Sequence, residues 1–155
     1  MKRLSMAAIT LVMLGGGGSA WAGSHGQVTY NDHIKPLMEQ KCFACHGERS
    51  PSIEEFDADQ KKYTSMMVGP RMTTYQELVA FVNGDDAGAI MRRLDDGKAT
   101  PTGKPGNMNI YLGGSAEERA KNLDLFKRWV GHWTLKRQAE LTAEDHKLFK
   151  ILEKR

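Results

Sequence analysis

The fold and the chemistry of this chain depend on one short stretch, Cys42-Phe43-Ala44-Cys45-His46. The stretch has the form C-x-x-C-H, which is the attachment signature of a c-type haem. Cysteines three positions apart lie on one face of a helical turn, so both thiols can add to the two vinyl groups of one porphyrin. The imidazole of His46 then lies under the ring and binds the iron from one side. The single motif predicts one covalently attached haem c with its iron.

Other uses of two nearby cysteines fit the rest of the sequence less well. A thioredoxin-like redox pair expects a βαβ unit, and the sequence shows no strand pattern. A structural zinc site needs four ligands, and the chain has two cysteines. A disulfide between Cys42 and Cys45 would not need the histidine that follows them. We therefore interpret the motif as a haem-attachment site.

The first 22 residues have the three parts of a secretory signal peptide. Two basic residues at positions 2 and 3 precede an apolar run over 4–14, and Ala20-Trp21-Ala22 supplies the small residues that signal peptidase recognises. The apolar run is about half of the ~20 residues that a membrane-spanning helix requires, which argues against a retained anchor. We predict cleavage after Ala22 and a periplasmic protein, in agreement with the attachment of c-type haem outside the cytoplasm.

Composition and charge restrict the partners of the exported chain. Removal of 22 residues from 155 leaves 133, and the formal net charge falls from +3 to about +1 because the signal carries two basic residues. Hydrophobic residues make up 40% and charged residues 26% of the full sequence, as in ordinary globular proteins. A nucleic-acid partner is not expected, because it would require a large basic excess. No later stretch is long and apolar enough to span a bilayer, so we expect no stable membrane insertion.

The spacing of apolar residues predicts an all-α chain. Helices are expected over 30–41, 74–83, 87–94, 116–130 and 141–153, with a weaker one near 53–62. The helix over 116–130 has the clearest start, because Ser115 and Glu118 have the spacing of a capping box. Residues 97–114 contain five glycines and two prolines, so they are expected to form a long loop. Loops of this length inside a compact domain usually have a function.

This loop contains Met108, within a polar stretch between Gly106 and Asn109. A thioether in such a loop has a use if it points inward, and a loop can lay a side chain over the flat face of a haem. Met108 is therefore our prediction for the second axial ligand of the iron. Met38 and Met91 fit apolar helix faces and are expected in the core. The other candidates for this ligand are Met66, Met67, Met72, His33 and His132.

Residues 28–133 resemble the class I c-type cytochromes. The shared order is a helix that ends in the C-x-x-C-H motif, then Val68-Gly69-Pro70, a middle helix, a methionine loop and an aromatic C-terminal helix. The resemblance implies that the Pro70 carbonyl accepts a hydrogen bond from the second ring nitrogen of His46 and orients this haem ligand. An ordinary turn proline is the alternative interpretation. The resemblance also implies that the first helix packs across the last.

The chain is therefore expected to have three parts. A signal peptide occupies residues 1–22, a cytochrome c-like helical domain around the haem occupies 23–133, and a C-terminal helical extension occupies 134–155. Asn109 follows the predicted methionine ligand, whereas many members of the family have proline at that position. The extension beyond residue 133 is an addition to the family pattern, and we expect it to cover an apolar edge of the core.

The resemblance implies an electron-transfer protein and not an enzyme, because iron with histidine and methionine ligands has no open position for a substrate. We expect a periplasmic single-electron carrier that meets donor and acceptor redox proteins through small, transient interfaces. An outer-membrane or inner-membrane electron-transfer complex is one such partner. Two other functions remain open at this point. One is a haem enzyme or gas sensor with an open or displaceable sixth site, and the other is a fixed subunit of a respiratory complex.

Overall fold

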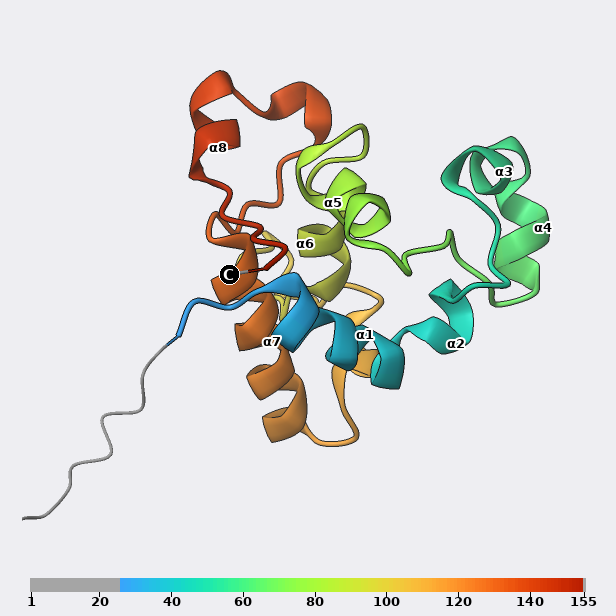
Figure 1. The fold of residues 1–155 in the computed structure, drawn as a ribbon, viewed down its shortest axis with the longest axis horizontal. Coiled ribbons are helices and arrows are strands. Elements are labelled where there is room, and N and C mark those ends of the chain that lie inside the picture. Colours follow the sequence, from blue (N-terminus) through green and yellow to red (C-terminus); the bar gives the residue numbers. More distant parts are fainter. Residues whose placement is uncertain (1–25, 155) are drawn as a thin grey trace, which may run out of the picture.

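The computed structural model describes residues 26–154 as helices joined by loops, with no strand in this part of the chain (Figure 1). The prediction of an all-α fold is confirmed. The predicted signal peptide and its cleavage site after Ala22 lie outside the described residues. In chain order the elements are the π-helical turn η1 (Tyr30–Ile34), α1 (Lys35–Lys41), α2 (Phe43–His46), α3 (Ile53–Ala58), α4 (Gln60–Ser65), α5 (Tyr75–Asn83), α6 (Ala89–Leu94), the 3-10 turn η2 (Asn109–Leu112), α7 (Ala116–Val130), the 3-10 turn η3 (Gln138–Glu140) and α8 (Ala143–Leu148).

The first predicted helix forms as two connected pieces, η1 and α1. Thr29 caps its start, because the Thr29 side chain accepts a hydrogen bond from the backbone N–H of Asp32. Pro36 lacks an N–H group, and its ring would collide with the carbonyl that a regular helix places four residues earlier. The chain passes this proline through a wider turn, in which the Lys35 N–H donates to the Tyr30 carbonyl. α1 then runs directly into the attachment motif.

α7 forms over the predicted residues, and η1 with α1 runs antiparallel along it. Tyr30 lies against Trp129 near the C-terminal end of α7, with ring centroids 6.3 Å apart. At the opposite end, Lys41 Nζ lies 2.6 Å from Glu118 Oε1. The first helix therefore packs across the last long one. Glu118 does not close the predicted capping box, because its other oxygen accepts the N–H of Gly114.

Helix caps fix the middle of the chain. Complete capping boxes start α3, with Ser52 and Glu55, and α5, with Thr74 and Glu77. The weak helix expected near 53–62 is divided at Asp59, whose backbone leaves the helical region with φ −150° and ψ 64°. The two short pieces, α3 and α4, lie beside α2 in Figure 1, away from the core that α7 organises.

The last residues fold back over the core (Figure 1). α8 is shorter than the predicted helix, because the backbone becomes extended at Phe149 and residues 149–154, the C-terminal tail, form no helix. The tail satisfies carbonyls at the end of α7 that have no partner within that helix, and it accepts hydrogen bonds from the start of η1. These bonds are Lys150 N to Val130 O (2.9 Å), Ile151 N to Trp129 O (3.0 Å), Tyr30 N to Leu152 O (2.7 Å) and Asn31 N to Glu153 O (3.0 Å). Within residues 26–154, no helix is long and apolar enough to cross a membrane.

Candidate haem site

The attachment motif forms one helical turn directly after α1. The backbone N–H groups of Cys45 and His46 both donate to the Cys42 carbonyl, at 3.1 and 3.0 Å. This turn carries two free thiols, of which Cys42 is half-buried and Cys45 is exposed. Burial raises the pKa of the Cys42 thiol to about 11, and the neighbouring Cys45 acts in the same direction. Cys42 is therefore a protonated thiol near neutral pH.

The His46 ring is held by the carbonyl of Pro70. The distance from His46 Nδ1 to the Pro70 oxygen is 2.7 Å. A carbonyl only accepts hydrogen bonds, so Nδ1 carries the proton and the lone pair lies on Nε2. Burial lowers the pKa of His46, while the bond to Pro70 acts in the opposite direction. The result is a neutral imidazole with one nitrogen fixed and the other available to a metal.

Residues 69–74, which we name the proline segment, run back along the attachment turn. The Gly69 N–H donates to the Cys45 carbonyl at 2.9 Å, and the Met72 N–H donates to the His46 carbonyl at 3.0 Å. Gly69 also lies directly against the imidazole of His46. A Cβ atom at this position would lie 2.1 Å from Cε1 and 2.6 Å from Nδ1 of the ring. Only glycine therefore fits beside the ring as it is placed.

Met108 lies on a different part of the chain, just before η2, and it is half-buried against the core. Its loop is fixed by the C-terminal end of α6, where three consecutive carbonyls would otherwise lack helical partners. These bonds are Gly106 N to Asp95 O (2.9 Å), Met108 N to Arg93 O (2.9 Å) and Asn109 Nδ2 to Leu94 O (2.8 Å). A Cβ atom on Gly106 would lie 2.3 Å from two of the α6 carbonyl oxygens, so the loop touches the helix end. Met108 is thus tied to the end of α6 by its own N–H, by that of Gly106 and by the Asn109 side chain.

The other methionines occupy different surroundings. Met38 and Met91 are buried in the core, as expected from the sequence, and Met72 is buried with them. Met66 and Met67, which follow α4, are 57% and 80% exposed. Met72 also lies on a segment that is tied to a helix, through its own N–H and the His46 carbonyl, but its side chain is buried with the core. The core positions are explained by packing alone.

The two candidate histidines both have hydrogen-bond partners elsewhere. His33 lies in the last turn of η1, and its Nδ1 accepts from the Thr29 N–H at 3.2 Å. His132 lies after α7, where its Nε2 is 3.0 Å from Asp145 Oδ1. Each imidazole is thus part of a local contact that closes a helix end or the C-terminal extension.

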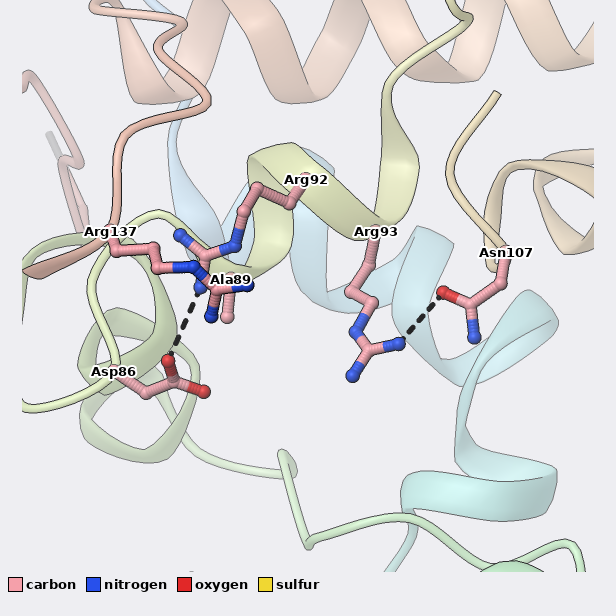
Figure 2. A pocket seen from close by; sticks show the side chains of 6 residues that line it. All are labelled: Asp86, Ala89, Arg92, Arg93, Asn107 and Arg137. Atoms are coloured by element: carbon pink, nitrogen blue, oxygen red, sulfur yellow. Dashed lines mark hydrogen bonds and ion pairs between the residues drawn. The ribbon is translucent and has the colours of Figure 1, made fainter. Parts of the chain in front are cut away.

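A basic pocket of about 340 Å³ lies beside the loop that contains Met108 (Figure 2). It is lined by Asp86, Ala89, Arg92, Arg93, Asn107 and Arg137. Arg92 is engaged, because it donates to the Lys136 carbonyl at 2.8 Å and pairs with Asp86 at 3.4 Å. Arg93 is exposed and donates to Asn107 Oδ1 at 3.1 Å, one residue before Met108. The pocket therefore places guanidinium groups, which can pair with a carboxylate, next to the loop that contains Met108.

The groups present fit a covalently bound haem. Two free thiols stand three residues apart on one turn, as attachment to a porphyrin requires. Nδ1 of the adjacent His46 imidazole is hydrogen-bonded to the Pro70 carbonyl, and such a bond orients a histidine that binds a metal through Nε2. The sequence identified Cys42, Cys45, His46 and Pro70, and the structure brings these four together. Reasoning from sequence missed Gly69 as a ring contact, although the Gly-Pro pair was a usable signal.

Comparison with known proteins agrees with this chemistry. The sequence profile of a family described as PccH cytochrome c matches residues 29–151. The solved structure of the monohaem cytochrome PccH from Geobacter sulfurreducens is similar over 82% of this chain and 99% of its own length, with 42% sequence identity and a TM-score of 0.77. No curated protein matches. The chain belongs to the PccH cytochrome c family, and it is a monohaem c-type cytochrome with one covalently bound haem c and an electron-carrier role.

Proposed function

We propose that the chain is a periplasmic single-electron carrier whose haem is attached to Cys42 and Cys45 and ligated by His46 and Met108. The observation that carries this proposal is the 2.7 Å contact between His46 Nδ1 and the Pro70 carbonyl. That contact has no evident use for an unligated histidine next to two thiols. It has a direct use for an axial ligand, because it fixes the ring and raises the electron density on Nε2.

When bound, the haem supplies an iron that accepts and returns one electron, and the protein sets the iron's potential and its access to solvent. His46 contributes a neutral, oriented imidazole. Met108 contributes a thioether from a loop that the end of α6 holds through Gly106 N–H, Met108 N–H and the Asn109 side chain. The His46 ring and the loop that carries Met108 are each held by hydrogen bonds to carbonyls, which should limit their movement when the charge on the iron changes. Electron transfer of this kind requires no side chain to take or release a proton.

The haem also carries two carboxylates that need partners. Arg93 is the best placed to bind one of them, because its guanidinium is exposed next to Asn107 and is not used in an ion pair among the described residues. Arg71 and Arg92 are less suitable, because each already pairs with a carboxylate of the protein. Neutralisation of one haem carboxylate by Arg93 would favour the reduced iron.

The cellular location and the partners of the protein are proposed from its N-terminal sequence and from its role as an electron carrier. The features of residues 1–22 support export, and haem c requires attachment outside the cytoplasm. We infer transient donor and acceptor proteins, because a carrier must release each partner after one electron has moved. Membrane-bound electron-transfer complexes on either face of the periplasm are suitable partners of this kind.

Absorption spectroscopy of the haem-loaded protein tests the proposal. The oxidised wild type should show the weak red absorption band of iron–methionine sulfur bonding, and Met108→Ala should lose it. Met66→Ala is the matched control, because Met66 is exposed and should not affect the band. A wild-type protein that is high-spin and binds carbon monoxide readily would instead favour an enzyme or gas sensor. Survival of the band in Met108→Ala would reject Met108 as the ligand.

A further inference from the structure

The proline segment is held at two ends. Its first part bonds to the attachment turn through Gly69 and Met72, and Arg71 N–H donates to the Pro51 carbonyl at 2.8 Å. Its last part, Thr73 and Thr74, leads into α5. Pro70 lies between Gly69 and Arg71, so the backbone bonds of these neighbours hold its carbonyl directly, and the bonds made by the Arg71 side chain, Thr73 and Thr74 hold the chain that follows it.

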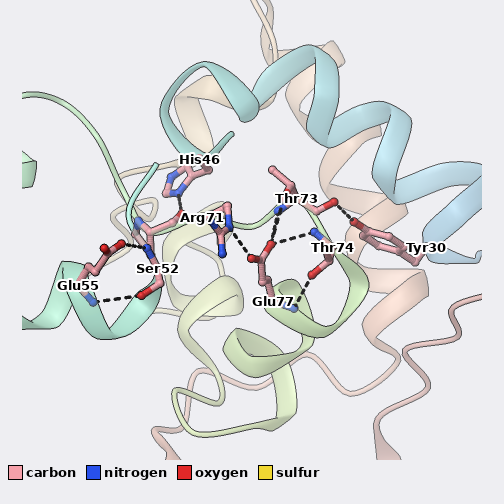
Figure 3. Close-up of polar contacts among 9 residues, drawn as sticks. Tyr30, His46, Ser52, Glu55, Arg71, Thr73, Thr74 and Glu77 are labelled. Carbon is pink, nitrogen blue, oxygen red and sulfur yellow. Dashed lines mark hydrogen bonds and ion pairs between the residues drawn. The ribbon is translucent and has the colours of Figure 1, made fainter. Parts of the chain in front are cut away.

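A single carboxylate supplies the second anchor (Figure 3). Glu77 Oε2 accepts from the backbone N–H groups of Thr73 and Thr74, at 2.8 and 3.0 Å, and from the Thr73 hydroxyl at 3.2 Å. Glu77 Oε1 accepts from Arg71 Nε at 2.6 Å. The Thr73 carbonyl in turn accepts from the Tyr30 hydroxyl at 3.1 Å, which joins this anchor to η1. Both carboxylate oxygens are therefore occupied by groups of the proline segment.

The electrostatics keep Glu77 ionised. Burial by itself raises the pKa of Glu77, but the bonds from Arg71, Thr74 and Thr73 outweigh burial and lower the pKa. The ion pair is partly exposed, with 25% of the Glu77 side chain and 36% of the Arg71 side chain accessible to solvent.

These contacts exceed what a helix cap requires. The equivalent glutamate of α3, Glu55, completes a capping box with Ser52. Among the described contacts, the Glu55 carboxylate accepts a hydrogen bond from the Ser52 N–H alone. Glu77 makes that same contact with Thr74 and adds those to Thr73 and Arg71. The extra bonds all go to the segment that carries Pro70, and Figure 3 shows both boxes together.

We propose that Glu77 is a positioning residue for the haem, because its carboxylate fixes the proline segment and so holds the Pro70 carbonyl against His46 Nδ1. The inference rests on the proposed ligation of the haem iron by His46. It assigns to Glu77 a part in setting the reduction potential, although Glu77 belongs to α5 and has no described contact with the attachment motif.

The direction in which Glu77 changes the reduction potential follows from the chemistry of the His46 ligand. A firm bond from Nδ1–H to a carbonyl makes Nε2 a stronger donor, which stabilises oxidised iron and lowers the potential. Loss of the Glu77 anchor should loosen this bond and raise the potential. Loss of the Glu77 negative charge also raises the potential, because a nearby anion stabilises the more positive iron. The experiment must therefore separate the anchor from the charge.

Four variants of the haem-loaded protein make this separation. Glu77→Ala and Glu77→Gln both remove the charge, but glutamine keeps a carbonyl oxygen that can accept from the Thr73 and Thr74 N–H groups. Thr74→Ala weakens the same capping box, because it removes the hydroxyl that accepts from Glu77 N–H, and leaves the Glu77 carboxylate in place. Glu55→Ala removes a capping-box carboxylate that does not hold the proline segment. The measurement is redox titration, with the red band recorded for each variant.

We expect the ratio of reduced to oxidised protein at a fixed potential to rise about threefold in Glu77→Gln and about tenfold in Glu77→Ala, where tenfold corresponds to 59 mV for one electron. Thr74→Ala and Glu55→Ala should stay close to wild type. Equal shifts in Glu77→Ala and Glu77→Gln would overturn the proposal, because charge alone would explain them. An equal shift in Thr74→Ala would also overturn it, because helix stability would then suffice.

If Glu77→Ala fails to accumulate with haem, Glu77→Asp takes its place, because aspartate keeps the negative charge on a side chain that is one methylene shorter. A raised potential in Glu77→Asp supports the anchoring role, and the wild-type potential in Glu77→Asp overturns it. The proposed function fails separately, since it would show as a wild-type protein without the red band. A wild type that has the band, together with Glu77 variants that keep the wild-type potential, would reject only the role of Glu77.

Discussion

Substitution of Gly69 by alanine should disturb the haem ligand more than any other single methyl group added to the site. The new Cβ atom would lie 2.1 Å from Cε1, 2.6 Å from Nδ1 and 2.9 Å from Nε2 of His46. Ordinary van der Waals contact begins at 3.4 Å, so the ring or the backbone must move by about 1.3 Å, the difference between 3.4 and 2.1 Å. The 2.7 Å bond from Nδ1 to the Pro70 carbonyl cannot keep its geometry through such a movement.

The cost combines overpacking with the loss of one hydrogen bond, together about 2–4 kcal/mol in the free energy of unfolding. Denaturant unfolding of the oxidised protein measures this cost, and redox titration should show a raised potential at the same time. Gly114→Ala is the matched control, because a Cβ atom there meets only Glu118 Oε2, at 3.9 Å. A Gly69→Ala protein with wild-type stability, potential and red band would refute the argument that the glycine sets the position of the ring.

Three further perturbations test other parts of the site. Gly106→Ala should weaken or displace the methionine ligand, because the added Cβ atom would lie 2.3 Å from two carbonyl oxygens at the end of α6. Loss of the red band and a rise in high-spin iron would report the displaced ligand, and an unchanged spectrum would contradict the prediction. Arg93→Gln should lower the reduction potential by the equivalent of roughly 1 kcal/mol, because Arg93 would no longer neutralise a haem carboxylate. Arg128→Gln, on the exposed side of α7, is the control and should leave the potential unchanged. Equal potentials in the two variants would contradict the proposed role of Arg93. Acid should loosen the C-terminal extension, because hydrogen bonds, first among them the bond from Lys136, hold the pKa of Asp145 below its ordinary 3.8. The ionised Asp145 therefore stabilises the fold above pH 3.8, and this stabilisation is lost as the pH falls toward the pKa of the folded state. The urea midpoint of the wild type should drop below about pH 4, and the midpoint of Asp145→Asn should drop less.

Much of the fold could be predicted because the decisive signals are carried by side chains. α7 was expected over 116–130 and forms there, since a hydroxyl-bearing cap, an apolar stripe and Gly131 mark its start, its face and its end. α5 was expected over 74–83 and forms over 75–83, behind a complete capping box of Thr74 and Glu77. The attachment turn could be predicted from three residues at fixed spacing, two cysteines and a histidine.

The features that were missed depend on backbone contacts, which leave little trace in the sequence. The π turn at η1 follows from Pro36, but its register depends on how the chain enters α1. The three carbonyls of α6 that hold the methionine loop have no residue signature at all. The tail was expected to continue α8, but its N–H groups instead donate to carbonyls at the end of α7. Helix propensity describes local preference only, so it does not predict such a contact with a distant helix. The sequence offers Arg71 and Arg92 as partners for a haem carboxylate, and it gives no sign that both pair with carboxylates of the protein, which is the reason that we propose Arg93 instead.

The bonds between the C-terminal tail and η1 have a consequence for the order of folding. The pair from Tyr30 to Leu152 spans 122 residues, since 152 minus 30 is 122, whereas His46 and Pro70 are 24 apart. The longer span costs more chain entropy to close, so contacts around the attachment turn should form early and the tail should dock last. The thiols of the motif would then be presented on a locally formed turn before the domain is complete, which is the stage at which a porphyrin can still be brought to them.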